Sequence, residues 1–450
     1  MKNSDTPKTI HFVALGCAKN RVDTEVMAGL AIREGLRLVP APEDADILVV
    51  NTCAFIESAK TESIEVLLEM AGKTKARGGI LVAAGCMAQR YADNLADEMP
   101  EIDYIVGTGN VESLIEIVAG RAERITVRKE PDHFLQGSKT PRFVEPSAAS
   151  AYVKIADGCN RQCAFCAIPG IRGRAHSREI GVIVEEVQRL VAQGIQEINL
   201  VAQDTSAYGR DLKDGTDLVG LLEALGADTD AAWIRLLYLY PDAVGDPLIE
   251  TIARLEQVVP YVDMPIQHAA DPMLTRMRRG HKSKLLRERI TRIRQTLPNV
   301  FLRTAILVGH PGETTNDFDT LCRFVEWAKF DHLGVFRYSP EEGTAAFSFD
   351  GVVSKRDSYN RHRRMMALQR RIAKERKKRL IGRKLPVLIE DFADEDGYVR
   401  VGRHIGQAPE VDGLTYVVSS DAPPKAIIEC EVTEAGDFDL VAAPVNSDAK

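Results

Sequence analysis

The chain has no apolar run that approaches the length of a membrane span, and its first residues, Met1–Thr9, are polar. A membrane-spanning helix needs about 20 consecutive, mainly apolar residues, so we expect neither membrane insertion nor a secretory signal. The net charge is also small, at −7 over 450 residues. We therefore expect a cytoplasmic protein of several domains, whose eight cysteines stay reduced and favour metal binding over disulfides.

One cysteine motif lacks the partner that a structural zinc site needs. Cys159, Cys163 and Cys166 follow a Cys-x3-Cys-x2-Cys spacing, and no second pair of cysteines follows them. Structural zinc sites usually take four protein ligands, and iron–sulfur clusters usually take four thiolates. Three close thiolates would leave one iron of a 4Fe–4S cluster open for chemistry. The alternatives are an incomplete zinc site or three unrelated thiols. We call these three residues the loop cysteine set.

The first third of the chain alternates predicted strands with predicted helices. The strands are His11–Leu15, Ile47–Val50 and Ile80–Ala84, and the helices are Asp23–Glu34, Ser58–Lys75 and Ala88–Glu98. This alternation implies right-handed βαβ units and a parallel sheet, which binds ligands beyond the carboxyl ends of its strands. Cys17, Cys53 and Cys86 each follow one of these strands. We predict that this N-terminal cysteine set forms a second three-thiolate metal site, with three structural thiols as the alternative.

Together these motifs resemble the radical-SAM methylthiotransferases over essentially the whole chain. The resemblance is carried by both cysteine sets and by the segments Leu15–Glu25, Asn51–Cys53, Gln203–Gly209, Pro265–His268, Val308–Glu313 and Phe336–Gly343. The tRNA-modifying members typically carry Gln-Met-Asn where this chain has Ala18-Lys19-Asn20, and Gln-Asn where it has Gln203-Asp204. The resemblance therefore favours the members that act on ribosomal protein uS12.

The resemblance implies insertion of a methylthio group at an unactivated C–H bond, the β-carbon of an aspartate of uS12. It also implies two 4Fe–4S clusters, one on each cysteine set. The cluster on the loop set would bind S-adenosylmethionine, and reduction by an external electron donor would release a 5′-deoxyadenosyl radical that abstracts the hydrogen. The cluster on the N-terminal set would present the sulfur, methylated by a second S-adenosylmethionine. A cofactor has to carry this chemistry because no side-chain base usefully removes such a proton.

The middle of the chain predicts a partial (β/α)6 radical-SAM barrel. Its predicted strands are Tyr152–Ile155, Glu197–Val201, Ile234–Tyr238, Val262–Met264, Phe301–Leu307 and Leu333–Phe336. Gln203 and Asp204 follow the second strand, at the rim where barrel active sites form, so we predict contact with S-adenosylmethionine or substrate. Helix capping by Asp204, Thr205 or Ser206 is the alternative. We expect His310, in a turn between a strand and a helix, to be structural.

Charge is unevenly distributed near the C-terminus. The stretch Lys355–Lys384 holds 14 Lys and Arg against two acids and predicts one amphipathic helix, which is either a solvated face or a docking surface for ribosomal RNA. Residues 385–450 hold 14 acids against four Lys and Arg. This net charge of −10 would repel RNA and attract a strongly basic protein. The segment resembles a TRAM domain, with strands predicted at Pro386–Glu390, Tyr398–Val401, Tyr416–Val418, Ala426–Val432 and Phe438–Val441.

The predicted fold class is α/β with three domains. An N-terminal parallel-sheet methylthiotransferase domain spans 8–124, a linker 125–144, the radical-SAM core 145–382 and a small TRAM-like β-barrel 383–450. Two other functions compete with the methylthiolation of uS12. A tRNA adenosine methylthiotransferase predicts a basic C-terminal domain, which this chain lacks. A non-catalytic electron-transfer or iron-sensing protein with two clusters leaves the large barrel without a purpose.

Overall fold

The computed structural model describes residues 8–128, 134–392, 399–418 and 421–445, which form two compact units. The first unit contains the described residues up to Val144, together with Lys154–Arg178 and Ser339–Phe347. The second contains Glu145–Val153, Glu179–Tyr338 and the described residues from Ser348 onward. Both cysteine sets therefore lie in the first unit, although the domain boundaries that we predict assign the loop set to the radical-SAM core. Those boundaries stay a prediction.

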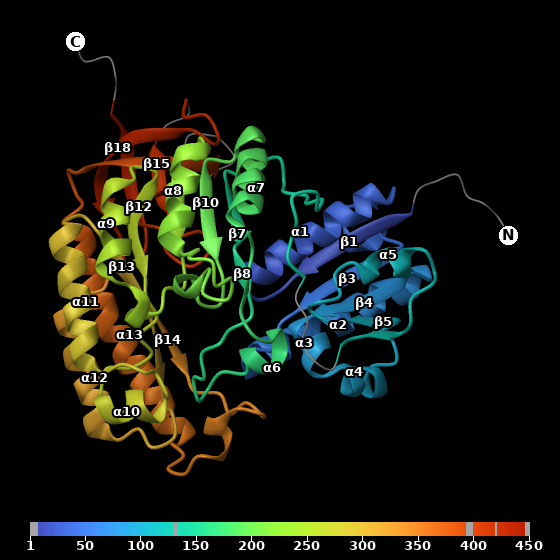
Figure 1. Ribbon diagram of the computed structural model, residues 1–450, viewed down its shortest axis with the longest axis horizontal. Helices are drawn as coiled ribbons and strands as arrows, with labels where there is room; N and C mark the ends of the chain where they lie inside the picture. The colour runs from blue at the N-terminus through green and yellow to red at the C-terminus, as the bar shows by residue number, and fades with distance from the viewer. Residues whose placement is uncertain (1–7, 129–133, 393–398, 419–420, 446–450) are drawn as a thin grey trace. The chain divides into compact units, whose positions relative to one another are not determined.

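The first unit is built on a parallel six-stranded sheet in the order β2-β1-β3-β4-β5-β6 (Figure 1). The strands are β1 (Thr9–Ala14), β2 (Arg37–Leu38), β3 (Ile47–Thr52), β4 (Ile80–Gly85), β5 (Tyr104–Val106) and β6 (Ile125–Thr126). The three predicted strands are confirmed as β1, β3 and β4. The other three escaped prediction because strands of two or three residues carry too little alternation to be recognised.

Helices cover both faces of this sheet. They are α1 (Ala18–Arg33), α2 (Glu57–Arg77), α3 (Cys86–Arg90), α4 (Ala92–Glu98) and α5 (Ser113–Val118). One core joins α1 and α5 to the face of β3 that carries Val49, and another joins α2, α3 and α4 to the face that carries Val50. Strand β3 is buried throughout because successive side chains point to opposite, covered faces. The predicted helix Ala88–Glu98 is wrong as a single element, since the chain breaks at Tyr91 between α3 and α4.

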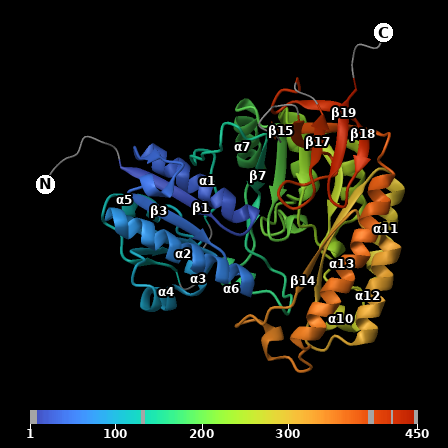
Figure 2. The same ribbon diagram turned by 180° about the vertical axis from the view of Figure 1, so that it is seen from behind.

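The second unit holds the predicted partial barrel, a six-stranded sheet in the order β14-β13-β12-β11-β10-β7. Its two outermost strands, β14 and β7, are labelled in Figure 2. Its strands are β7 (Ser150–Lys154), β10 (Glu197–Val201), β11 (Trp233–Leu236), β12 (Val258–Asp263), β13 (Phe301–Val308) and β14 (His332–Arg337). Its helices are α7 (Ile180–Ala192), α8 (Leu218–Asp228), α9 (Asp246–Arg254), α10 (Asp271–Arg276), α11 (Ser283–Thr296), α12 (Thr315–Ala328) and α13 (Lys355–Lys378). The sheet keeps two edges, β7 and β14, so the barrel is open as predicted. No helix of the described residues is long and apolar enough to cross a bilayer.

The chain ends in a closed five-stranded barrel, in the order β15-β16-β17-β19-β18. Its strands are β15 (Lys384–Phe392), β16 (Val399–His404), β17 (Thr415–Val418), β18 (Ile427–Ala435) and β19 (Leu440–Pro444). The predicted small barrel is confirmed, although Tyr398, where we expected the second strand to begin, lies outside the described residues. Helix α13 ends at Lys378 and not at the predicted Lys384, because the chain turns at Gly382 and Lys384 already belongs to β15.

Candidate functional site

The three residues of the N-terminal cysteine set meet at one edge of the first sheet. Cys17 precedes α1, Cys53 directly follows β3, and Cys86 begins α3 directly after β4. Strands β1, β3 and β4 are neighbours, so their carboxyl ends bring the three thiols together. Gly16, the residue before Cys17, packs closely against Cys53. A Cβ added to Gly16 would lie 2.7 Å from Cys53 Cβ and 2.9 Å from Cys53 Sγ.

A buried amide, Asn20, ties the three cysteine-bearing ends together. Its Nδ2 donates to the carbonyl oxygens of Leu15 at 3.1 Å and Thr52 at 2.9 Å, the residues just before Gly16-Cys17 and Cys53. Its Oδ1 lies 3.6 Å from Cys86 Sγ. Asn20 appeared in the sequence only within a motif, and nothing in its spacing indicated that one side chain would contact all three ends.

The surroundings of these thiols oppose and assist ionisation at the same time. Burial raises the pKa of Cys53 to about 12, and the neighbouring thiols Cys86 and Cys17 add to the rise. Burial also raises the pKa of Cys86, against the opposing charge of Arg172. At Cys17, burial is outweighed by the charges of Lys19 and Arg172 and by backbone hydrogen bonds, so its pKa is lowered. The thiolates that a metal requires would therefore depend on positive charge brought by the metal and by Arg172.

The donor chemistry fits an iron–sulfur cluster better than a single ion. Across the described ranges, no group of three or more His, Cys, Asp or Glu side chains is arranged to hold one metal ion. A 4Fe–4S cluster makes a different demand, because each cysteine binds a different iron and the sulfurs surround the cluster instead of meeting at a point. Three thiols from three adjacent strand ends supply soft ligands for three of the four irons. The residues present therefore fit such a cluster.

The loop cysteine set lies between two short elements, β8 (Ala156–Asp157) and α6 (Ile168–Arg172). Strand β8 pairs antiparallel with β9 (His176–Ser177), which closes the loop at its base. Within the loop, the Cys159 amide donates to the Gly173 carbonyl at 3.0 Å and the Cys166 amide to the Cys163 carbonyl at 3.1 Å. All three cysteines are partly exposed. This arrangement leaves the thiols accessible on a short, internally bonded loop, as a cluster with an open iron requires.

The other predicted site residues lie in the second unit. Gln203 and Asp204 follow β10 at its carboxyl end, as expected. Asp204 makes no side-chain capping bond to the short helix Thr205–Ala207, and its Oδ1 instead accepts from Ser206 Oγ at 2.5 Å. The capping alternative for Asp204 is therefore wrong, and its role as a cofactor contact stays a prediction.

His310 has the surroundings of a structural residue. It is fully buried, packs edge-on against Tyr338, and places Nδ1 3.0 Å from the Pro311 carbonyl oxygen. Burial lowers its pKa to about 4, so the imidazole is neutral near pH 7.

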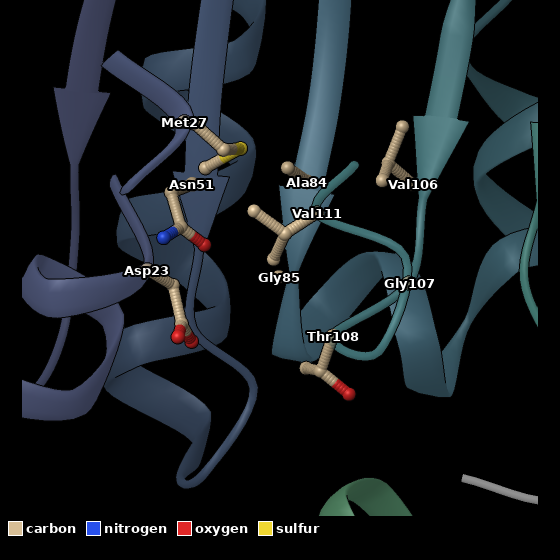
Figure 3. A pocket seen from close by; sticks show the side chains of 9 residues that line it. All are labelled: Asp23, Met27, Asn51, Ala84, Gly85, Val106, Gly107, Thr108 and Val111. Atoms are coloured by element: carbon tan, nitrogen blue, oxygen red, sulfur yellow. The ribbon is translucent and has the colours of Figure 1, made fainter. Parts of the chain in front are cut away.

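A small cavity lies beside the N-terminal cysteine set (Figure 3). Its volume is about 10 Å³, at the lower limit for a single water molecule. Asp23, Asn51 and Thr108 contribute polar groups to its wall, and Met27, Val106 and Val111 close it on the apolar side. The cavity is too small for S-adenosylmethionine.

Comparison with known protein families divides the chain into three matched regions. Residues 9–107 match the Uncharacterized protein family UPF0004, residues 153–325 match the Radical SAM superfamily, and residues 381–445 match the TRAM domain. Together with the three-cysteine loop and the open barrel, these matches define the class of the protein as a radical-SAM enzyme.

Relatives of nearly the same length narrow the class further. The ribosomal protein uS12 methylthiotransferase RimO of Sorangium cellulosum is 47% identical over 442 residues, covering 96% of this chain and 90% of the relative. The RimO protein of Myxococcus xanthus is 45% identical over 441 residues, covering 98% and 92%. The chain belongs to the RimO family of radical-SAM methylthiotransferases. The family favoured by the sequence motifs is therefore confirmed.

Solved structures share the fold at much lower identity. The radical S-adenosylmethionine methyltransferase TsrM from Kitasatospora setae matches with a TM-score of 0.56 and 16% identity, covering 76% of this chain and 77% of that protein. The cobalamin-dependent S-adenosylmethionine radical enzyme OxsB matches with a TM-score of 0.52 and 10% identity, covering 79% and 56%. At such identities the likeness concerns the fold alone.

Proposed function

We propose that this chain transfers a methylthio group to the β-carbon of an aspartate of ribosomal protein uS12, in the cytoplasm, using two 4Fe–4S clusters and two molecules of S-adenosylmethionine. The observation that carries the proposal is the convergence of Cys17, Cys53 and Cys86 at one sheet edge, within the same compact unit as the loop cysteine set. An enzyme that only generated a radical would need the loop set alone.

The two cysteine sets have separate tasks in this proposal. The loop set holds the cluster that binds S-adenosylmethionine, and the N-terminal set holds the cluster that presents sulfur. When bound, these groups supply the 5′-deoxyadenosyl radical, the sulfur and the methyl group. The protein's own contribution is to hold the thiols, bury Cys53 and Cys86, and keep both sets in one compact unit. Gln203 and Asp204, at the carboxyl end of β10, are proposed contacts of S-adenosylmethionine.

The C-terminal barrel offers an acidic surface for a basic ribosomal protein. On β18, Glu429, Glu431 and Glu434 are exposed, while Cys430 and Val432 between them are buried in the barrel. Alternation along the strand turns Glu429 and Glu431 outward, and the register shift between Val432 and Glu434 leaves Glu434 exposed as well. Such a surface would speed association with a basic partner and discourage contact with RNA through this barrel.

Four arginines of α13, the basic helix, already pair with carboxylates on α12 or next to its ends. Arg361, Arg364, Arg371 and Arg376 lie within 2.7–2.9 Å of Glu313, Asp319, Glu326 and Asp331, respectively. A second stripe is exposed and recurs at helical spacing, formed by Arg356, Arg363, Lys374 and Lys378. We propose that this stripe, and not the whole helix, contacts ribosomal RNA when uS12 is modified on a ribosomal particle.

Anaerobic turnover of the reconstituted protein tests the proposal. Dithionite replaces the external electron donor, and a uS12 peptide and a substrate tRNA are offered in parallel with S-adenosylmethionine. We expect a mass increase of one CH2S unit on the peptide and none on the tRNA. An adduct on tRNA alone would overturn the substrate, and absence of 5′-deoxyadenosine would overturn the radical chemistry.

A further inference from the structure

Four buried charged side chains join the loop cysteine set to the helix that follows Cys17. Lys154 ends β7, Asp157 ends β8 just before Cys159, Arg172 ends α6, and Asp23 lies on α1. All four belong to the first unit, and their side chains are only 1–6% exposed. We call these four residues the charged ring.

The contacts within the charged ring alternate in sign. Arg172 donates to Asp157 at 2.8 and 3.1 Å and to Asp23 at 3.0 Å. Lys154 Nζ completes the ring, with Asp23 at 2.5 Å and Asp157 at 3.1 Å. Removing one member of a buried ion pair is strongly destabilising, because it leaves the other member as an uncompensated buried charge. The ring therefore holds the base of the cysteine loop firmly against α1.

The charged ring is neutral as a whole but not symmetric. Its Arg172 end also donates to Asn20 Oδ1 at 2.7 Å, the same oxygen that lies 3.6 Å from Cys86 Sγ. The Lys154 end instead reaches the Phe134 carbonyl oxygen at 3.3 Å. The Arg172 guanidinium is thus the cation of the charged ring that lies nearest to the N-terminal cysteine set.

We propose that Arg172 is a positioning residue that raises the reduction potential of the cluster on the N-terminal cysteine set. This inference rests on the proposed function, which assigns a cluster to that set. Reduction adds negative charge to a cluster, and a buried cation close to its ligands stabilises that charge. Charge and hydrogen bonding around the sulfurs are among the properties that set iron–sulfur potentials.

The test isolates the N-terminal cluster in the full chain. Cys159, Cys163 and Cys166 are all changed to Ala, the protein is reconstituted, and the cluster is titrated potentiometrically with EPR detection. Arg172→Met should lower the reduction equilibrium constant about tenfold, which is about 59 mV toward negative potential for a one-electron couple. Arg172→Lys, which keeps the charge, should stay near the parent.

Arg174→Met is the matched control, because Arg174 lies two residues further along the same segment but is exposed. It should leave the potential unchanged. A potential unaffected by Arg172→Met, or lowered equally by Arg174→Met, would overturn the inference. A merely structural role for Arg172 would change the yield of cluster without shifting its potential.

A second variant keeps the charges of the ring balanced, in case Arg172→Met alone prevents folding. Arg172→Met combined with Asp157→Asn removes one cation and one carboxylate, leaving Lys154 paired with Asp23. This double variant should also move the potential in the negative direction. If the parent without loop cysteines takes up no cluster at all, the assignment of the N-terminal site fails, which is the failure of the proposed function. If the cluster forms but its potential is the same with and without Arg172, only the proposed role of Arg172 is overturned.

Discussion

Arg172 donates to the carboxylate of Asp23 at 3.0 Å, and this contact joins the segment after the loop cysteine set to the helix after Cys17. The two cysteine sets are separated by more than seventy residues of sequence, from Cys86 to Cys159. This buried ion pair joins the two segments that carry the cysteine sets. A substitution in either segment should therefore alter the surroundings of both cysteine sets. Only the removal of cysteines tests each set separately.

Single cysteine variants should separate the two proposed clusters. Cys159→Ala should abolish reductive cleavage of S-adenosylmethionine, because the loop set would lose one of its three thiolates. Cys53→Ala should leave cleavage measurable and stop methylthio transfer. Chromatography of 5′-deoxyadenosine and mass spectrometry of the uS12 peptide give the two readouts. Methylthiolated product from Cys53→Ala would show that the N-terminal set does not supply the sulfur.

Gly16→Ala should impair cluster binding by the N-terminal set. Gly16 has a φ of +86°, and an added Cβ would meet Cys53 Cβ at 2.7 Å. The matched control is Gly35→Ala, with a φ of +83° and nothing within 4 Å of the added atom. Both variants should lose about 1 kcal/mol through backbone strain, but only Gly16→Ala displaces a ligand. Iron content in the background without loop cysteines should fall for Gly16→Ala alone, and an equal fall in both would contradict the clash.

Stability should fall between pH 6.5 and pH 4 partly through His310. Burial lowers its pKa from 6.5 to about 4, so in this window the unfolded chain binds a proton that the folded chain does not. At about 1.4 kcal/mol per pKa unit, the stability present above pH 6.5 decreases by about 3 kcal/mol as the pH falls. His310→Asn should show a correspondingly smaller loss in urea titrations at pH 7 and about pH 4.5. A residual loss is expected because the pKa of buried His404 is also lowered.

Glu197→Gln should destabilise the second unit by about 3 kcal/mol, because it leaves two buried cations short of a partner. Glu197 is fully buried and accepts from Arg235 at 2.8 Å and from Arg403 of the C-terminal barrel at 2.5 Å. Urea unfolding followed by tryptophan fluorescence reports on this unit, since Trp233 and Trp327 both lie in it.

The control for that variant is Glu223→Gln, whose partner Arg254 and own side chain are both more than half exposed. Its loss should stay below about 1 kcal/mol, as for most exposed ion pairs. Equal losses for Glu197→Gln and Glu223→Gln would mean that burial does not strengthen the Glu197 pairs.

Replacing the outward carboxylates of β18 should reduce the efficiency with which the enzyme modifies uS12. Glu429→Gln with Glu431→Gln should lower kcat/KM for full-length uS12 several-fold, with the larger effect at low salt because screening weakens exposed charges. Cleavage of S-adenosylmethionine without substrate should be unchanged. Glu250→Gln, which changes an exposed side chain of α9, serves as the charge control. An effect that is independent of salt would argue against electrostatic docking.

The strands that carry the chemistry could be predicted because their patterns are local. Residues Ile47–Val50 form an apolar run that is followed by Asn51, Thr52 and then Cys53, so the strand and its thiol are recognisable from neighbours along the chain. Strand β6 was missed because two residues carry too little alternation, and the break between α3 and α4 was missed because it depends on tertiary packing. The six cysteines were found for the same local reason, and their role as cluster ligands stays a prediction.

The amino-acid sequence by itself determined the family, the order of three folded parts and the spacing of the two cysteine sets. Only the tertiary structure decided which polar side chains serve those sets. In sequence, Arg172 and Arg174 are equivalent arginines on either side of Gly173, yet Arg172 is buried against Asp157 and Asp23 while Arg174 is exposed. Asn20 likewise contacts three strand ends that are remote in the chain. The physical reason is that periodicity and spacing record neighbours along the chain, whereas burial and pairing of charge depend on residues brought together only by folding.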